Sequence, residues 1–115
     1  MKTDRELLEL AARASGVDWF DEPAAVAGIG LHMKSGPFWN PLTDDGDALR
    51  LAVRLGMVID ARYTGPESMR YNSVAYWVAP SGGRHISFGD TEADFDAATR
   101  RAITRAAAAI GEGMK

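Results

Sequence analysis

Three aspartates, Asp44, Asp45 and Asp47, stand close together in the chain, and their carboxylates are the first groups that suggest chemistry. Hard cations such as Ca²⁺ bind clustered carboxylate oxygens. The segment Asp-Asp-Gly-Asp, however, lacks the spaced oxygen ligands and the final glutamate of a calcium-binding loop. The alternative is that these acids cap a helix and interact favourably with its dipole. We therefore predict the start of a helix here and no metal site.

An aromatic pair precedes these acids in the segment Phe38-Trp39-Asn40-Pro41. In one interpretation Trp39 anchors the loop to the core, Asn40 makes a turn and Pro41 fixes the direction of the chain. In the other, the aromatic side chains form a stacking platform beside a helix N-terminus, where backbone N–H groups favour an anion. We expect the structural role first. Trp39 and Asn40 are kept as candidate partner- or ligand-binding residues.

Signatures of enzymes are missing from the sequence. The chain has two histidines, His32 and His85, and no cysteine, so no spacing indicates a zinc site or a cysteine nucleophile. It has no Ser-His-Asp pattern, no phosphate-binding loop and no Gly-x-Gly-x-x-Gly segment. The sequence therefore predicts a protein without catalytic residues, metal or cofactor, and an enzyme is the third-ranked alternative.

Length and composition indicate one ordered domain over residues 1–115, with 46% hydrophobic and 25% charged residues. The net charge of −3 argues against general binding to duplex nucleic acid or to an anionic membrane. No apolar run approaches the ~20 residues of a membrane-spanning helix. The absence of cysteine is typical of a reducing compartment, so we expect a cytoplasmic protein. A homo-oligomer is kept as a further candidate partner state.

The spacing of apolar residues predicts three helices, over residues 4–15, 45–56 and 90–111. Polar caps stand at the start of each one: Thr3 or Asp4, then Thr43 or Asp44 with Asp47 three residues after Asp44 in a variant of the capping box, then Thr91 with Asp94. Gly16, Gly56 and Gly111 are each expected to end a helix. The stripe of the second helix is expected to comprise Ala48, Leu51, Ala52 and Leu55, widened by Leu49 and Val53.

Alternation and β-forming residues predict strands over residues 57–63, 71–79 and 84–89. Turns are expected at residues 64–68 and 80–83. The resulting fold is α+β. It consists of a three-stranded antiparallel sheet with helices on one face, an α-β-β-β-α core, to which the N-terminal helix and a short strand or loop around residues 26–33 are added.

The open face of this sheet is the main candidate site. If Val74, Tyr76 and Val78 point inward, alternate residues of the same strand point outward, including Tyr71 and Trp77. We expect these residues to share the open face with Asp60, Arg62, His85 and Ser87. An exposed tryptophan beside arginine and histidine is typical of a surface for a partner or a planar ligand. The opposite phase, which buries Trp77, remains an alternative.

The element order resembles that of the double-stranded RNA-binding domain, whose last helix begins with lysines that bind phosphates. In this sequence Glu92, Asp94 and Asp96 stand where that family has lysines. Arg100, Arg101 and Arg105 follow one to three turns later. The acids would repel phosphates, so we expect weak or no binding to duplex nucleic acid, and a nucleic-acid-binding module is the alternative function.

A second resemblance covers most of the chain. The segment GPFWNPLTDDGDALRLAVRLGM, with ELLELAARASG before it and DAATRRAITRAAAAIG after it, is similar to small tailed-phage and prophage proteins with a W-N-P-L-x-D-D-G-D-A-x-R-L-A pattern. The resemblance implies a phage accessory protein in the bacterial cytoplasm. By analogy, we expect a non-enzymatic protein that blocks or sequesters a host component, such as a protein of anti-phage defence or a signalling nucleotide.

Overall fold

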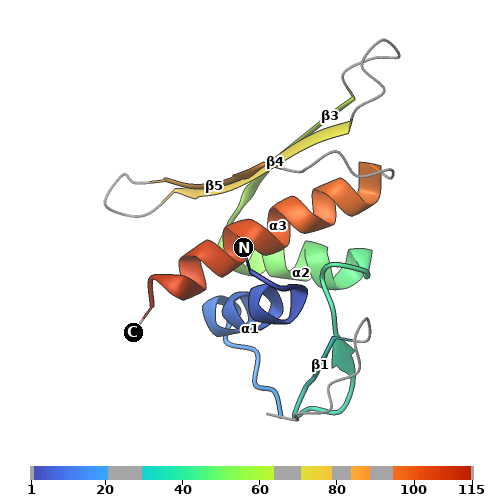
Figure 1. The fold of residues 1–115 in the computed structure, drawn as a ribbon, viewed down its shortest axis with the longest axis vertical. Helices are drawn as coiled ribbons and strands as arrows, with labels where there is room; N and C mark the ends of the chain where they lie inside the picture. Colours follow the sequence, from blue (N-terminus) through green and yellow to red (C-terminus); the bar gives the residue numbers. More distant parts are fainter. Residues whose placement is uncertain (1, 21–29, 64–70, 79–83, 89–94, 115) are drawn as a thin grey trace.

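The computed structural model describes residues 2–20, 30–63, 71–78, 84–88 and 95–114, and for residues 60–63, 71–78, 84–88, 95 and 98 it describes the backbone. Helices and strands are mixed, so the predicted α+β class is confirmed (Figure 1). The order is α1 (Asp4–Ser15), β1 (Leu31–His32), β2 (Phe38–Trp39), α2 (Asp45–Leu55), β3 (Val58–Tyr63), β4 (Tyr71–Val78), β5 (Arg84–Phe88) and α3 (Phe95–Glu112). In the described part of the chain, no helix is both long and apolar enough to cross a membrane.

The first two helices begin and end where the sequence predicts. Thr3 and Glu6 form a reciprocal capping box at the start of α1, and the side chain of Asp44 accepts a hydrogen bond from the backbone of α2. Gly16 and Gly56 follow the two helices in the left-handed conformation, with φ of 75° and 65°. A residue without a Cβ adopts this conformation without strain, which explains both helix ends. The expected cap at Thr91 and Asp94 lies outside the described residues.

The third helix continues past Gly111 to Glu112, so the expectation that Gly111 ends it was wrong. A Cβ added at Gly111 would overlap the backbone carbonyl of Leu10 in α1. The two helices approach closely because their contact consists largely of small residues: Ala11 and Ala12 on α1 and Ala106, Ala107 and Ala108 on α3 are buried. Gly111 is therefore a packing residue and not a helix terminator.

The strands β3, β4 and β5 lie in that order, and both neighbouring pairs are antiparallel. The turns predicted at residues 64–68 and 80–83 lie outside the described residues. A second, smaller pairing joins β1 to β2, with Leu31 opposite Trp39. Of the short strand expected around residues 26–33, the structure has Leu31–His32, while residues 26–29 lie outside the described residues.

The sheet packs on α3, while α1 and α2 contact α3 from the other side (Figure 1). The expectation that α2 also packs directly on the sheet was wrong. Its buried residues, Ala48, Leu51 and Ala52, join the cluster formed by α1, α3 and the short strands. This cluster is a helical layer whose described core residues are mostly alanines and leucines, with Trp39 as its one large aromatic side chain among the buried residues.

Candidate functional site

The segment that leads into α2 is a fixed part of the scaffold. The side chain of Trp39 is 5% exposed and belongs to the core cluster, which confirms its interpretation as an anchor. Asn40 is also buried, and its side-chain oxygen accepts a hydrogen bond of 3.0 Å from the backbone N–H of Leu42. Its backbone carbonyl accepts further bonds from Thr43 and Asp44. Asn40 therefore forms the turn that the sequence predicts.

Asp47 connects this turn to the helix. Its Oδ2 accepts a hydrogen bond of 2.9 Å from the backbone N–H of Asn40. Its Oδ1 accepts one of 2.7 Å from Arg50. The backbone N–H of Asp47 in turn donates to the capping oxygen of Asp44 over 2.8 Å. One half of the predicted capping box is thus confirmed, but the other half was wrong, because the Asp47 carboxylate binds Asn40 and not the cap residue.

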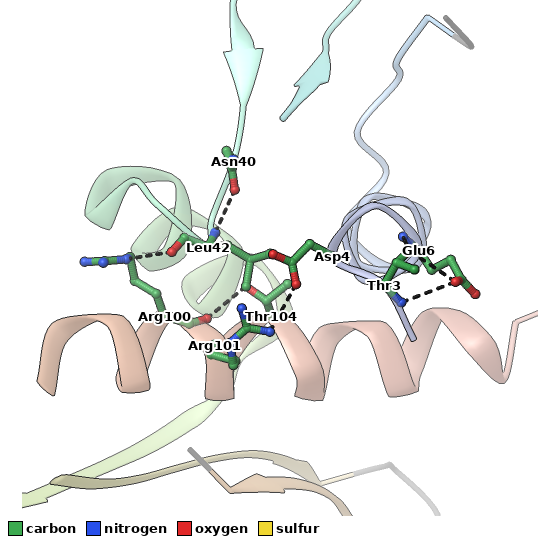
Figure 2. Close-up of polar contacts among 8 residues, drawn as sticks. All are labelled: Thr3, Asp4, Glu6, Asn40, Leu42, Arg100, Arg101 and Thr104. Carbon is green, nitrogen blue, oxygen red and sulfur yellow. Dashed lines mark hydrogen bonds and ion pairs between the residues drawn. The ribbon is translucent and has the colours of Figure 1, made fainter. Parts of the chain in front are cut away.

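The same turn is held from α3. Nε of Arg100 donates to the carbonyl of Leu42 over 3.0 Å (Figure 2), and the guanidinium also pairs with Asp45 at 2.6 Å. Arg101 pairs with Asp4 at 3.2 Å (Figure 2). Two of the arginines that follow the acidic start of α3 are therefore engaged within the protein. The three aspartates at residues 44–47 likewise serve the fold, and the described residues contain no group of three or more potential metal ligands.

The outer side of α2 carries two exposed apolar side chains. Leu49 is 59% exposed and Val53 is 71% exposed, so the expectation that they widen the buried stripe was wrong. The reason is geometric: α2 buries one face against α3 and the loop, and these two residues lie one turn apart on the other face. Phe38, at the edge of β2, is also largely exposed. Large apolar side chains that lie together on a surface mark a candidate interaction site.

A groove of about 840 Å³ lies beside this face. Its lining is mainly apolar and comes from the end of α1, the β1–β2 pair and α2: Val17, Met33, Pro37, Phe38, Trp39, Leu49, Leu51 and Val53. Ser15, Asp44, Asp47, Arg50 and Arg54 add polar groups. The volume falls in the range of known ligand pockets, ~300 to 1,000 Å³. The groove accommodates an apolar group together with an ionic contact.

Charge is unevenly distributed in the groove. At its α2 N-terminal end, the guanidinium of Arg50 lies 2.7 Å from Asp47 and 3.8 Å from Asp44. At its other end, Arg54 is exposed, and among the described residues it has neither a hydrogen bond nor an ion pair. An anion placed there would pair with Arg54 without displacing an existing partner. Sequence reasoning missed Leu49, Val53 and Arg54, although an apolar stripe too wide for one buried face was a usable signal.

An aromatic stack borders the groove. The ring of His32 contacts both Phe20 and Phe38, with centroid distances of 5.0 and 4.9 Å. The His32 and Phe38 rings are nearly parallel, with an interplanar angle of 22°. The stack fixes Phe38 at the groove edge although its side chain is 48% exposed. A rigid exposed aromatic ring loses little conformational entropy when a ligand packs on it.

For the candidate residues of the sheet, the structure gives backbone register. Trp77 pairs with His85, so these two belong to one face as expected. Arg62 pairs with Asn72 and falls at the opposite parity, so the expectation that Arg62 shares a face with Trp77 was wrong. Tyr71 falls on the face of Trp77 and pairs with Tyr63. Asp60 and Arg62 pair with Val74 and Asn72. The register therefore places them on the sheet face opposite to the rest of the predicted site.

The same register exposes a conflict between two sequence interpretations. Ile59 pairs with Ala75 and therefore lies on the face of Trp77. Placing Asp60 and Arg62 on the open face puts Ile59 on the other face of the strand, whereas the alternation of β4 puts Ala75 together with Trp77 on the open face. These assignments exclude one another, since directly opposed residues share a face. The predicted exposure of Trp77 stays a prediction.

Comparison with protein-family models, with curated proteins and with solved structures finds no match. Trp39 and Asn40 serve the scaffold, and the α2 groove combines a cavity with exposed apolar side chains and an available charge.

Proposed function

We propose that this chain is a small non-enzymatic binding protein that blocks or sequesters a host component by seating a protein segment in the α2 groove. The carrying observation is that Leu49, Val53 and Phe38 line one cavity and remain exposed, with Arg54 beside them. Burial of such side chains by a partner is favourable by ~25 cal/mol per Å² of apolar surface. Arg54 supplies direction and selectivity through an ion pair.

Groove composition favours a protein segment over a signalling nucleotide. A nucleotide carries one or more phosphates and needs several donors, whereas most of the lining here is apolar and Arg50 is already paired with two carboxylates. An amphipathic segment needs apolar contacts and few charges. A signalling nucleotide remains the other outcome of the experiment below.

We infer that the binding unit is an α-β-β-β-α core, in which a three-stranded sheet supports helices on one side. Two observations support this core: the antiparallel pairings β3–β4 and β4–β5, and the contacts of α3 with all three strands. We further propose a phage or prophage accessory role in the bacterial cytoplasm, including inhibition of anti-phage defence, on the strength of the W-N-P-L-x-D-D-G-D-A-x-R-L-A pattern.

The nucleic-acid-binding alternative has less support. Arg100 and Arg101 are bound to Asp45 and Asp4 within the protein. Engaged guanidinium groups add little to phosphate binding, which depends on the release of counterions by available cations. The net charge of −3 also opposes association with a polyanion.

The experiment is affinity capture from bacterial lysate with the whole chain as bait, followed by mass spectrometry of proteins and small molecules. Wild type is compared with Val53→Asp, which places a charge in the groove, and with Met114→Asp, a matched change at an exposed apolar residue outside the groove lining. We expect a protein retained by wild type and Met114→Asp and lost with Val53→Asp. Capture of a nucleotide and no protein, or of a protein insensitive to Val53→Asp, would contradict the proposal.

A further inference from the structure

We propose that, without a host partner, the α2 groove is occupied by a second copy of this chain, with the two α2 helices antiparallel about a twofold axis. The inference uses the groove on which the proposed function rests. Self-association would bury Leu49 and Val53. A host segment would then have to displace the second copy from the groove. Three features of α2 carry the inference: its charge pattern, the side of the helix on which the charges lie, and the central position of Leu49 between them.

The charge pattern of α2 is self-complementary. Asp44 stands at its N-terminal end and Arg54 in its last turn, with Leu49 and Val53 exposed between them. Ten residues separate the two charges, which is about 15 Å along a helix. An occupant that matches the groove must therefore present an acid at one end, apolar residues one turn apart in the middle and a base at the other end. An antiparallel α2 has this pattern.

The charges also lie on the side of α2 that symmetry requires. A twofold axis perpendicular to two antiparallel helices brings the same flank of each helix together. The Asp44 carboxylate lies 3.8 Å from Arg50. Arg50 and Arg54 lie one turn apart on α2, and Asp44 reaches toward Arg50, so the three charges share one flank of the helix. The pairing therefore directs Arg54 of each copy toward Asp44 of the other, and two equivalent ion pairs form.

The position of Leu49 sets the register. Leu49 lies midway between the two charges, five residues after Asp44 and five before Arg54. With the axis near Leu49, the two Leu49 side chains meet and Arg54 of each copy lies opposite Asp44 of the other. The surface over Gly46 is already covered by Arg50 and Asp44, whose polar atoms lie 3.2 Å from the position of the missing Cβ, so Val53 packs beside these side chains. Phe38 and the groove wall complete the apolar enclosure.

Association is measured by sedimentation velocity with the full chain alone, from about 1 to 200 µM, because an interface built on one helix is small and weak. We expect a monomer–dimer equilibrium. Val53→Asp should raise the dissociation constant at least tenfold, and Met114→Asp should leave it unchanged. Circular dichroism confirms that each variant is folded.

A mixing experiment tests the register. Arg54→Asp places two acids opposite each other in its own dimer, and Asp44→Lys places two bases opposite each other, so each variant alone should dimerise at least tenfold more weakly. In an equimolar mixture both contacts pair opposite charges, and the dimer should recover. Because Asp44 also caps α2, recovery in the mixture separates lost contacts from a damaged fold.

Several results would overturn the inference. They are a monomer at about 200 µM, a dimer insensitive to Val53→Asp, or a mixture no tighter than its components. None of these results touches the proposed function, since no host molecule is present. Conversely, a groove-dependent dimer with no groove-dependent capture from lysate would remove the proposed function and leave the self-association in place.

Discussion

The backbone N–H of Asn40 donates to the carboxylate of Asp47 over 2.9 Å, and this bond ties the turn before α2 to the first turn of the helix. Both residues are more than nine-tenths buried. The acid thus has a task within the fold, which is to satisfy a backbone donor that water does not reach. Asp47, one of the three clustered aspartates, thus attaches the loop before α2 to the helix.

Replacement of Asp47 by alanine should lower the free energy of unfolding by about 2 kcal/mol, because it leaves the buried N–H of Asn40 without its acceptor. The matched control is Asp45→Ala. The side chain of Asp45 is 74% exposed in its ion pair with Arg100, and such pairs contribute at most ~1 kcal/mol. Urea titration of both variants is the measurement. Equal losses would show that the Asn40–Asp47 bond has no special weight.

Trp39→Ala should destabilise the protein by ~3 kcal/mol or more, the usual result of truncating a buried aromatic side chain. Phe38→Ala, at the neighbouring residue, should cost less than about 1 kcal/mol because that ring is 48% exposed. Thermal melting distinguishes the two. The groove interpretation also expects Phe38→Ala to weaken partner capture. A Trp39→Ala variant that melts like wild type would place Trp39 outside the core.

Gly111→Ala should destabilise the fold by about 1 to 3 kcal/mol, since overpacking forces α1 and α3 apart. Alanine in a helix otherwise stabilises relative to glycine, so the sign of the effect tests the close contact with Leu10. Gly113→Ala is the control, because the nearest atom to its added Cβ is 3.6 Å away. It should change stability by less than ~0.5 kcal/mol. A stabilised Gly111→Ala variant would contradict the observed helix packing.

Binding to duplex RNA or DNA should be weak at physiological salt. α3 begins with an acid in its first turn, and Arg100 and Arg101 are held by Asp45 and Asp4. A gel-shift titration at several salt concentrations checks this. Submicromolar affinity with a steep salt dependence would instead support the nucleic-acid-binding alternative.

Local rules predicted the elements well. The starts of α1 and α2 follow from polar caps at Thr3 and Asp44, and their ends from Gly16 and Gly56. The turn at Asn40 follows from its own side chain. These features depend on residues within four positions of one another, so a short segment of the sequence contains every group that takes part.

The sequence by itself therefore determined the α+β class, the helix starts and the buried anchor Trp39, whereas the tertiary structure decided how the elements face one another. In the sequence Gly111 looks like a helix terminator, but in the structure α1 packs on it. Leu49 and Val53 look like core residues, but α3 covers the other side of α2 and leaves them exposed. Arg62 was expected on the sheet face of Trp77, but the strand register places the two residues on opposite faces. In the first two cases the deciding contact is made by residues far apart in the chain, and in the third it is the register between neighbouring strands. Periodicity shows which face of an element is apolar, but packing partners decide which apolar face is buried and which remains as a site.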